Sequence, residues 1–219
     1  MILAFLLCGG LLFAIQPAES WTAGTQGKFL AAGQANVTTE GGNVTPLDLS
    51  SNISTEKWAG YWGNVTGEIV LAPGLGAPLF YSWTWDSGDG GEVCAVAAAS
   101  GFDWSGLQGT SAAAIDGIWN FGAATDNATE TFNETCSIEI AGFSIPTTDG
   151  SFTGQRVDFM TCVLADQASP ADKSDLAFCV DITQDGGLFN TFTGDYELLA
   201  PANETAGATE THYFWLELD

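Results

Sequence analysis

The segment Leu79-Phe80-Tyr81-Ser82-Trp83-Thr84-Trp85 carries the strongest secondary-structure signal in the chain. Aromatic side chains occupy every second position, at Tyr81, Trp83 and Trp85, and small polar side chains separate them. Residues two apart lie on the same face of an extended chain, so this alternation predicts a β-strand. We expect its aromatic face to be buried, either in the core of the fold or in a contact between subunits.

Further strands are expected on both sides of this segment. Turns rich in Gly, Pro and Asp at 73–78 and 86–91 flank it, so residues 58–98 indicate a meander of three or four strands. Only Ser111–Trp119, with three alanines, favours a helix. More strand candidates follow at Ser137–Phe143, Arg156–Leu164, Leu176–Ile182, Tyr196–Leu199 and Thr211–Leu218. The sequence therefore predicts an all-β fold, a β-sandwich of about 8–10 strands with one short helix near 111–119.

The composition restricts the classes of partner. The chain of 219 residues has 27 acidic and 4 basic residues, which gives a net charge of −23. Four basic side chains cannot neutralise a row of phosphates, and we therefore expect no nucleic-acid partner. Attraction to an anionic membrane surface is disfavoured for the same reason. The 46% share of hydrophobic residues allows one sizeable core. We expect residues 58–219 to form a single domain.

The first 57 residues differ from the rest in composition. Residues 2–15 are uncharged and mostly apolar, which is typical of the hydrophobic part of a signal peptide, so residues 1–18 are predicted to be a cleaved leader. A retained anchor is the alternative. Residues 19–57 are polar and rich in Gly, Thr and Asn, which indicates an arm without a core of its own. We expect Phe29 and Leu30 on this arm to belong to a donor strand in a subunit interface.

Asparagine placement predicts export and N-glycosylation. The chain has nine Asn and 37 Ser and Thr, so chance predicts about 1.5 Asn-x-Ser/Thr sequons. Seven occur, and none has proline in the middle position. The predicted acceptors of N-linked glycans are Asn36, Asn43, Asn52, Asn64, Asn127, Asn133 and Asn203.

The four cysteines beyond the leader are predicted to form two disulfides, because an even number of cysteines is typical of an exported protein. A symmetric hairpin over the loop at 169–172 puts Cys162 opposite Cys179, within disulfide range. By elimination, Cys94 is then expected to bond Cys136. A zinc site is disfavoured, because the sequence contains no Cys-x-x-Cys pair.

No catalytic residue is predicted. His212 is the only histidine and lies in an apolar segment, where packing is its expected role. The turn with Asp86, Asp89 and Glu92 offers hard oxygen ligands on a Gly-rich loop, so these residues are a candidate calcium site, with a solvated turn as the alternative. The aromatic strand around Trp83 offers a surface for sugar stacking as an alternative to burial. Beyond calcium and N-linked glycans, no cofactor is expected.

Three short segments resemble a group of uncharacterised exported surface proteins of archaea: Trp58-Ala59-Gly60-Tyr61-Trp62-Gly63-Asn64-Val65-Thr66-Gly67, Leu79-Phe80-Tyr81-Ser82-Trp83 and Thr211-His212-Tyr213-Phe214. The resemblance covers residues 40–219 and implies an extracellular location but no activity. In architecture the chain is also similar to archaeal extracellular filament subunits, which are glycosylated β-sandwiches whose N-terminal strand completes the next subunit.

These observations favour a structural role over a catalytic one. We expect an extracellular glycoprotein that forms a cell-surface filament or surface layer with copies of itself, by donation of the N-terminal arm to the last strand. That strand is apolar on both faces, and Tyr213 and Trp215 are its expected contact residues. A carbohydrate- or calcium-dependent adhesin is the alternative, and a secreted hydrolase with two converging carboxylates is a third possibility.

Overall fold

The fold is all-β, as predicted, with one helix of two turns. The structure is a computed structural model that describes residues 15–18, 20–29, 36–74, 76–153, 157–202 and 209–219. The predicted helix is α1, and the predicted strand at Arg156–Leu164 is β9, although Arg156 itself lies outside the described residues.

The described residues form fourteen strands, two α-helices and two short 3-10 helices. In chain order they are β1 (Gln16–Pro17), β2 (Trp58–Gly63), β3 (Gly67–Leu71), β4 (Tyr81–Trp85), β5 (Gly91–Val96), η1 (Trp104–Gly106), β6 (Gln108–Gly109), α1 (Ala112–Trp119), α2 (Ala128–Thr131), β7 (Glu134–Ile140), β8 (Phe143–Phe152), β9 (Met160–Ala165), η2 (Lys173–Asp175), β10 (Leu176–Asp181), β11 (Gly186–Gly187), β12 (Thr193–Gly194), β13 (Tyr196–Pro201) and β14 (Tyr213–Leu218).

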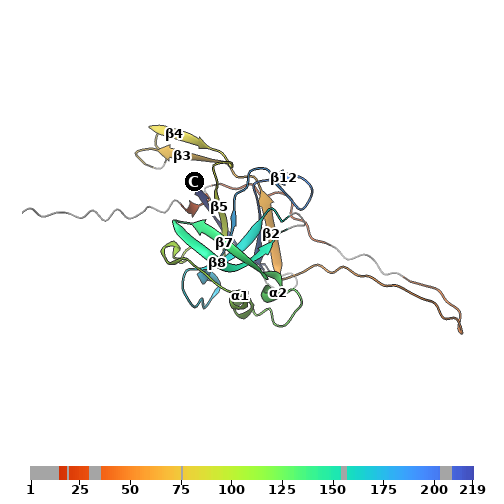
Figure 1. The fold of residues 1–219 in the computed structure, drawn as a ribbon. Coiled ribbons are helices and arrows are strands. Elements are labelled where there is room, and N and C mark those ends of the chain that lie inside the picture. Colours follow the sequence, from red (N-terminus) through yellow and green to blue (C-terminus); the bar gives the residue numbers. More distant parts are fainter. Residues whose placement is uncertain (1–14, 19, 30–35, 75, 154–156, 203–208) are drawn as a thin grey trace, which may run out of the picture.

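One antiparallel sheet dominates the molecule (Figure 1). Its strand order is β1-β14-β5-β10-β9-β8-β7, and β6 adds to β9. Three two-stranded sheets, β2–β13, β3–β4 and β11–β12, complete the fold. The central strands β5, β9 and β10 are almost fully buried, so both faces of the large sheet carry apolar side chains.

The two faces of the large sheet bury two separate cores. The first core joins the sheet to β2, β13 and α1, and its members include Val93, Ala95, Val163, Phe178, Val180, Ile115, Trp119, Leu198 and Ala200. The second core lies between the opposite face and the β7–β8 hairpin, and it includes Cys94, Val96, Leu164, Ala177, Ile138, Ile140 and Ile145. The sheet is therefore the middle layer of the protein.

The β7–β8 hairpin is an extension of the sheet that folds back over it. β8 pairs with β9 only through its last three residues, Gly150–Phe152, and its first part continues with β7 across the second core. The hairpin turn, Ala141 and Gly142, has positive φ angles of 53° and 73°, as a tight two-residue turn requires. The N–H of Ala141 donates a hydrogen bond of 2.6 Å to Oε2 of Glu217 on β14. This hydrogen bond ties the β7–β8 hairpin, at one edge of the sheet, to β14, the second strand from the other edge.

The four cysteines beyond the predicted leader all form disulfides, but the predicted pairing is wrong. The bonds join Cys94 to Cys179 and Cys136 to Cys162, with Cα–Cα distances of 4.1 and 5.6 Å. Cys162 does lie opposite Cys179, as predicted. However, Cys179 lies between two cysteines, since Cys94 is its partner in register on the other side. The fold-back of β7 brings Cys136 to Cys162 and leaves Cys179 to bond Cys94.

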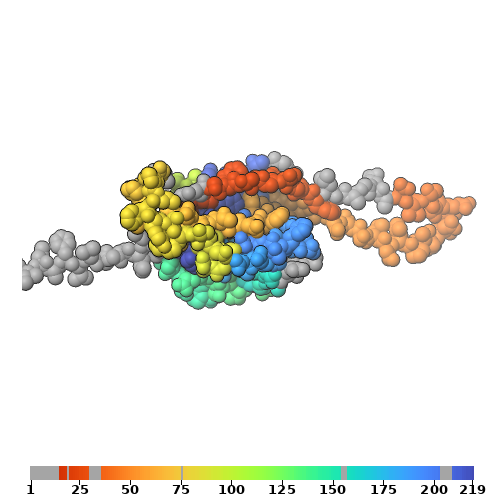
Figure 2. Space-filling model, turned by 90° about the horizontal axis from the view of Figure 1, so that it is seen from above, coloured from red at the N-terminus to blue at the C-terminus, as the bar shows by residue number. Residues whose placement is uncertain are grey.

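The β3–β4 hairpin projects from one end of the molecule, and the part of the arm from residue 36 onward, orange in Figure 2, projects from the other. Trp85, at the base of the hairpin, is buried, with 4% of its surface exposed. Tyr81 and Trp83 are 49% and 54% exposed, so the first alternative, burial in the core, is wrong for them, and burial in a subunit contact stays a prediction. The alternation of residues 81–85 predicted the strand correctly. Of its three aromatic residues, Trp85 lies in the core, whereas Tyr81 and Trp83 lie outside it.

Gly150 is required where the Cys136–Cys162 disulfide passes over β8. A Cβ at residue 150 would lie 2.7 Å from Cβ of Cys136 and 3.1 Å from Sδ of Met160. We expect Gly150→Val to lower the free energy of unfolding by ~1–3 kcal/mol, measured by urea denaturation. The control is Gly60→Val on β2, where no atom lies within 4 Å of the added Cβ. Equal losses in the two variants would contradict the close packing of the disulfide on β8.

Candidate functional site

The predicted calcium ligands do not lie together. Asp86 and Asp89 share the β4–β5 turn, where Oδ2 of Asp89 accepts the N–H of Asp86 at 3.1 Å and Oδ1 of Asp86 accepts the N–H of Gly88 at 3.0 Å. Glu92 lies on β5 and is buried beside Glu217. The described residues contain no group of three or more His, Cys, Asp or Glu side chains arranged to hold a metal ion. Calcium binding at this turn stays a prediction.

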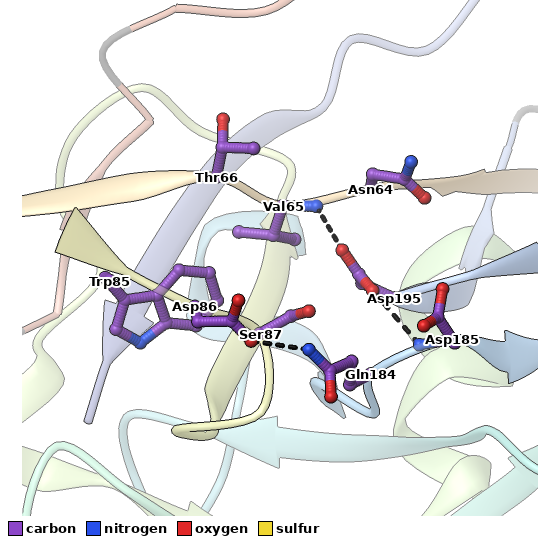
Figure 3. Close-up of a pocket in the computed structure, with 9 residues that line it drawn as sticks. All are labelled: Asn64, Val65, Thr66, Trp85, Asp86, Ser87, Gln184, Asp185 and Asp195. Atoms are coloured by element: carbon purple, nitrogen blue, oxygen red, sulfur yellow. Dashed lines mark hydrogen bonds between the residues drawn. The ribbon is translucent and has the colours of Figure 1, made fainter.

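A polar hollow lies beside this turn (Figure 3). Four segments of the chain meet there: the β2–β3 connection, the end of β4 with the turn after it, the β10–β11 loop and Asp195, which lies between β12 and β13. The lining residues are Asn64, Val65, Thr66, Trp85, Asp86, Ser87, Gln184, Asp185 and Asp195. The amide of Gln184 donates to Oδ1 of Asp86 and so connects two of these segments.

Asp195 organises the hollow. Its side chain is 6% exposed, and Oδ2 accepts the N–H of Val65 at 2.9 Å while Oδ1 accepts the N–H of Asp185 at 3.3 Å. Both carboxylate oxygens are therefore engaged with the backbone of neighbouring loops, which is how a buried carboxylate is normally stabilised. Asp195 has a positioning role in the fold.

The hollow is lined by oxygen and amide groups. Its nine lining residues offer carboxylate, amide and hydroxyl groups, and include no histidine, cysteine or lysine. His212 lies elsewhere, with Nδ1 2.9 Å from the Tyr61 hydroxyl, and the two rings pack edge to face. Burial lowers the pKa of His212. The arrangement fits the packing role expected for this histidine.

A buried pair of carboxyl groups lies on β5 and β14, on the face of the sheet that carries Cys94. Glu92 on β5 is directly opposite Glu217 on β14, and the two side chains are only 6% and 7% exposed. Burial, together with the neighbouring charge of Glu217, raises the pKa of Glu92 to about 9 from an ordinary value of 4.5. Burial also raises the pKa of Glu217. Glu92 is thus protonated at neutral pH, a state in which its O–H can donate to Glu217.

Sequence reasoning missed this pair, although a signal for it exists. Glu92 was assigned to the acidic turn because it follows Asp86 and Asp89 closely. It also precedes Cys94 by two residues on a strand, so the two side chains lie on the same face. A face that holds a disulfide in the interior is buried, and Glu92 is buried with it.

The sequons lie on the surface wherever they are described. Five of the acceptor asparagines are exposed: Asn36, Asn43, Asn52, Asn64 and Asn133. Asn127 is half-buried, because its Oδ1 caps α2 through the N–H of Glu130 and its Nδ2 donates to the carbonyl of Gly122. Asn203 lies outside the described residues. Because a glycan is attached to Nδ2, Asn127 is the least available of these six acceptors.

Within the described residues, the outer edge of β14 is paired over a short length. Gln16 and Pro17 of β1 lie opposite Leu216 and Trp215, and the N–H of Ala18 donates to the carbonyl of Phe214 at 2.9 Å. These residues belong to the end of the predicted leader.

The predicted interface residues are only partly brought together. Tyr213 is 40% exposed, and Trp215 is half-buried against the ring of Trp104. Phe29 is 53% exposed on the arm and is in no described strand, and Leu30 lies outside the described residues. In this structure β1, rather than the arm, lies beside β14.

The aromatic face of the β3–β4 hairpin is poorly suited to stacking sugars. The rings of Tyr81 and Trp83 meet at an interplanar angle of 68°, so they do not form a flat platform. Their partners in register are Leu71 and Ile69, which have no hydrogen-bonding side chains for sugar hydroxyls. The predicted glycan surface thus has aromatic residues in a geometry that does not favour the adhesin alternative.

Comparison of the chain with protein-family models, with curated proteins and with solved structures finds no match. In the part of the chain that the structure describes, no helix is long and apolar enough to cross a membrane. A function for this chain must therefore be inferred from its own surfaces, edges and charges.

The Glu92–Glu217 pair makes the stability depend on pH. The folded state keeps a proton on Glu92 between its ordinary pKa of 4.5 and about 9, whereas the unfolded state loses it, so stability falls as pH rises through that range. We expect the melting temperature to be higher at pH 5 than at pH 8.5, and Glu92→Gln to reduce the difference by about 5 °C or more. The exposed control Glu40→Gln should leave the pH dependence unchanged. An unchanged slope in Glu92→Gln would contradict the protonated state of Glu92.

Proposed function

We propose that this protein is a structural glycoprotein of the cell exterior that assembles with copies of itself by strand addition to β14. The observation that carries this proposal is the incomplete pairing of β14. The strand runs from Tyr213 to Leu218, and among the described residues two, Gln16 and Pro17 of β1, pair with its outer edge. Unpaired backbone N–H and C=O groups at a sheet edge are a template for a further strand.

Side-chain burial on β14 supports the same proposal. Five of its six residues are half-buried or exposed, whereas all six residues of the neighbouring β5 are buried. Phe214 and Leu216 pack against the first core, and Trp215 packs against the second, from the other face of the strand. A donor strand longer than β1 would cover more of this apolar surface on both faces, which is a source of binding energy.

The arm is a suitable donor. The 40 residues between Pro17 and Trp58 can span about 130 Å when extended, enough to reach a neighbouring molecule. Trp21 and Phe29 on the arm are 79% and 53% exposed, so they are free to cover a partner. Cleavage of the predicted leader after Ala18 would remove β1 and open the edge of β14. In this proposal β1 is a placeholder, and the arm of another copy replaces it.

An exterior location is supported by two disulfides and by exposed sequons. Disulfides persist in oxidising compartments, and glycans are added to exported chains. The net charge of −23 favours solubility of single subunits, because like charges repel. Directed strand addition is then the means by which subunits overcome that repulsion and join in a defined way.

The test is substitution of the donor residues in the chain as secreted by its host. We expect Trp21→Ser combined with Phe29→Ser to reduce assembly at least tenfold and to leave the melting temperature unchanged, because both side chains are exposed in the single molecule. Assembly is measured by electron microscopy and analytical ultracentrifugation.

The matched control is Val44→Ser with Ile53→Ser, which removes two side chains that are 97% and 87% exposed further along the arm. This control should assemble as the unmodified protein does. Normal fibres or layers from the donor variant, or a leader-free protein that stays monomeric at all concentrations, would rule out donation by the arm.

A further inference from the structure

The β3–β4 hairpin has an apolar surface that the proposed strand addition does not use. We define the hairpin surface as six side chains that are 42–82% exposed: Ile69, Leu71, Leu79, Phe80, Tyr81 and Trp83. The hairpin forms a sheet of its own, and it projects beyond the body of the protein (Figure 2). Contiguous exposed apolar side chains of this kind mark a contact site.

Charge narrows the choice of partner. The 17 residues from Ile69 to Trp85 include no charged side chain, in a chain whose net charge is −23. Glu68, just before this stretch, is the only charged residue of the two strands. The hairpin surface therefore offers no charge to an ionic partner, and the body of the protein repels an anionic one.

The side chains change in character from the tip of the hairpin to its base. Leu79 and Phe80 lie next to the turn, and Phe80 is 82% exposed. Tyr81 and Trp83 follow along β4, and the charged residue Asp86 comes directly after that strand. Aliphatic and phenyl groups at the tip, tyrosine and tryptophan behind them and charge at the base are the order found at a boundary between lipid and water.

The backbone of the tip lacks several donors that would need water. Pro73 and Pro78 have no N–H group. The N–H of Ala77 donates to the carbonyl of Gly74 at 3.1 Å, and the N–H of Phe80 donates to the carbonyl of Leu71 at 2.8 Å. The free-energy cost of moving these groups out of water is therefore lower than for an ordinary exposed loop.

We infer that the hairpin surface binds a lipid bilayer with uncharged or zwitterionic head groups, with the tip at Leu79 and Phe80 inserted among the lipids. The insertion is shallow. The outer edges of β3 and β4 are unpaired in the described structure, and unpaired backbone groups are too costly in the hydrocarbon interior. The aromatic side chains of Tyr81 and Trp83 then lie at the level of the head groups.

A sugar or a second copy of the chain fits these observations less well. The angle between the Tyr81 and Trp83 rings and the aliphatic residues opposite them disfavour sugars, as described above. A protein partner would cover one face of the hairpin. Val70 and Phe80 directly precede Leu71 and Tyr81, so they lie on the other face of the hairpin, and they are 50% and 82% exposed. Lipids can surround the end of the hairpin, so a bilayer accounts for the exposure of apolar side chains on both of its faces and near its tip.

The test is hydrogen–deuterium exchange of the full chain with and without phosphatidylcholine vesicles. Since residues 2–15 are apolar and can bind vesicles themselves, the readout must be local to the hairpin. We expect amides in residues 69–85 to exchange at least threefold more slowly with vesicles, and amides in residues 186–194 to be unaffected. Phe80→Ser should abolish the slowing, and the control Phe189→Ser, at a site that is 58% exposed, should retain it.

Varying the salt concentration and the lipid charge provides a second part of the test. Slowing that persists when NaCl is raised from about 0.1 to about 1 M, and that weakens with phosphatidylserine vesicles at low salt, supports an uncharged contact repelled by anionic lipid. Unchanged exchange in residues 69–85 would overturn the inference, and so would equal slowing in Phe80→Ser. Slowing that needs no vesicles and rises with protein concentration would assign the hairpin surface to a second copy instead.

Discussion

The fold-back of the β7–β8 hairpin over the large sheet is the constraint on which the rest of the fold depends. It begins at Gly150, where β8 leaves the plane shared with β9, and the Cys136–Cys162 disulfide crosses at the same place. The hydrogen bond from Ala141 to Glu217 fixes the other end of the hairpin on β14. Between these two points the hairpin covers an apolar face of the sheet that would otherwise be exposed to water.

This closure determines which parts of the chain remain available for contacts. With the second core covered by β7 and β8, and the first by β2, β13 and α1, the sheet has little free surface. The incompletely paired edge of β14, the described residues of the arm and the β3–β4 hairpin lie outside the closed body. Self-assembly and lipid contact are proposed for these three features because each has apolar or backbone groups without a partner among the described residues.

The carboxyl pair at Glu92 and Glu217 links the closure to the edge strand. The side chain of Glu217 accepts the N–H of Ala141 in the β7–β8 turn. Glu217 also lies opposite Glu92 on β5, so this residue of β14 adjoins both the β7–β8 hairpin and β5. Loss of the proton from Glu92 would place two negative charges in a buried site.

Local patterns predicted the elements well, because the period of the side chains reports the local backbone. The alternation at 81–85 predicted β4, the alanines at 112–114 predicted α1, and the loop at 169–172 predicted the register of Cys162 with Cys179. What surrounds each element depends on the whole fold. Alternation cannot tell whether an aromatic face meets a core, so Tyr81 and Trp83 were expected either in the core or in a contact between subunits.

The disulfide pairing failed for a related reason. Register predicts neighbours, but Cys179 has a cysteine on each side, at Cys94 and Cys162, and only the fold-back of β7 decides between them. Likewise, Glu92 was assigned to the same site as Asp86 and Asp89 because the three are close in sequence. Glu92 in fact lies on β5, and its side chain is buried. The strand alternation that was used for Trp83 would have placed Glu92 beside Cys94.

Disulfide mapping of the native protein by mass spectrometry tests the fold-back most directly. Peptides joined through Cys136–Cys162 and through Cys94–Cys179 are the result expected when β7 lies over β9. Peptides joined through Cys162–Cys179 and Cys94–Cys136 would mean that the hairpin does not hold this position, and would contradict the closure of the sheet.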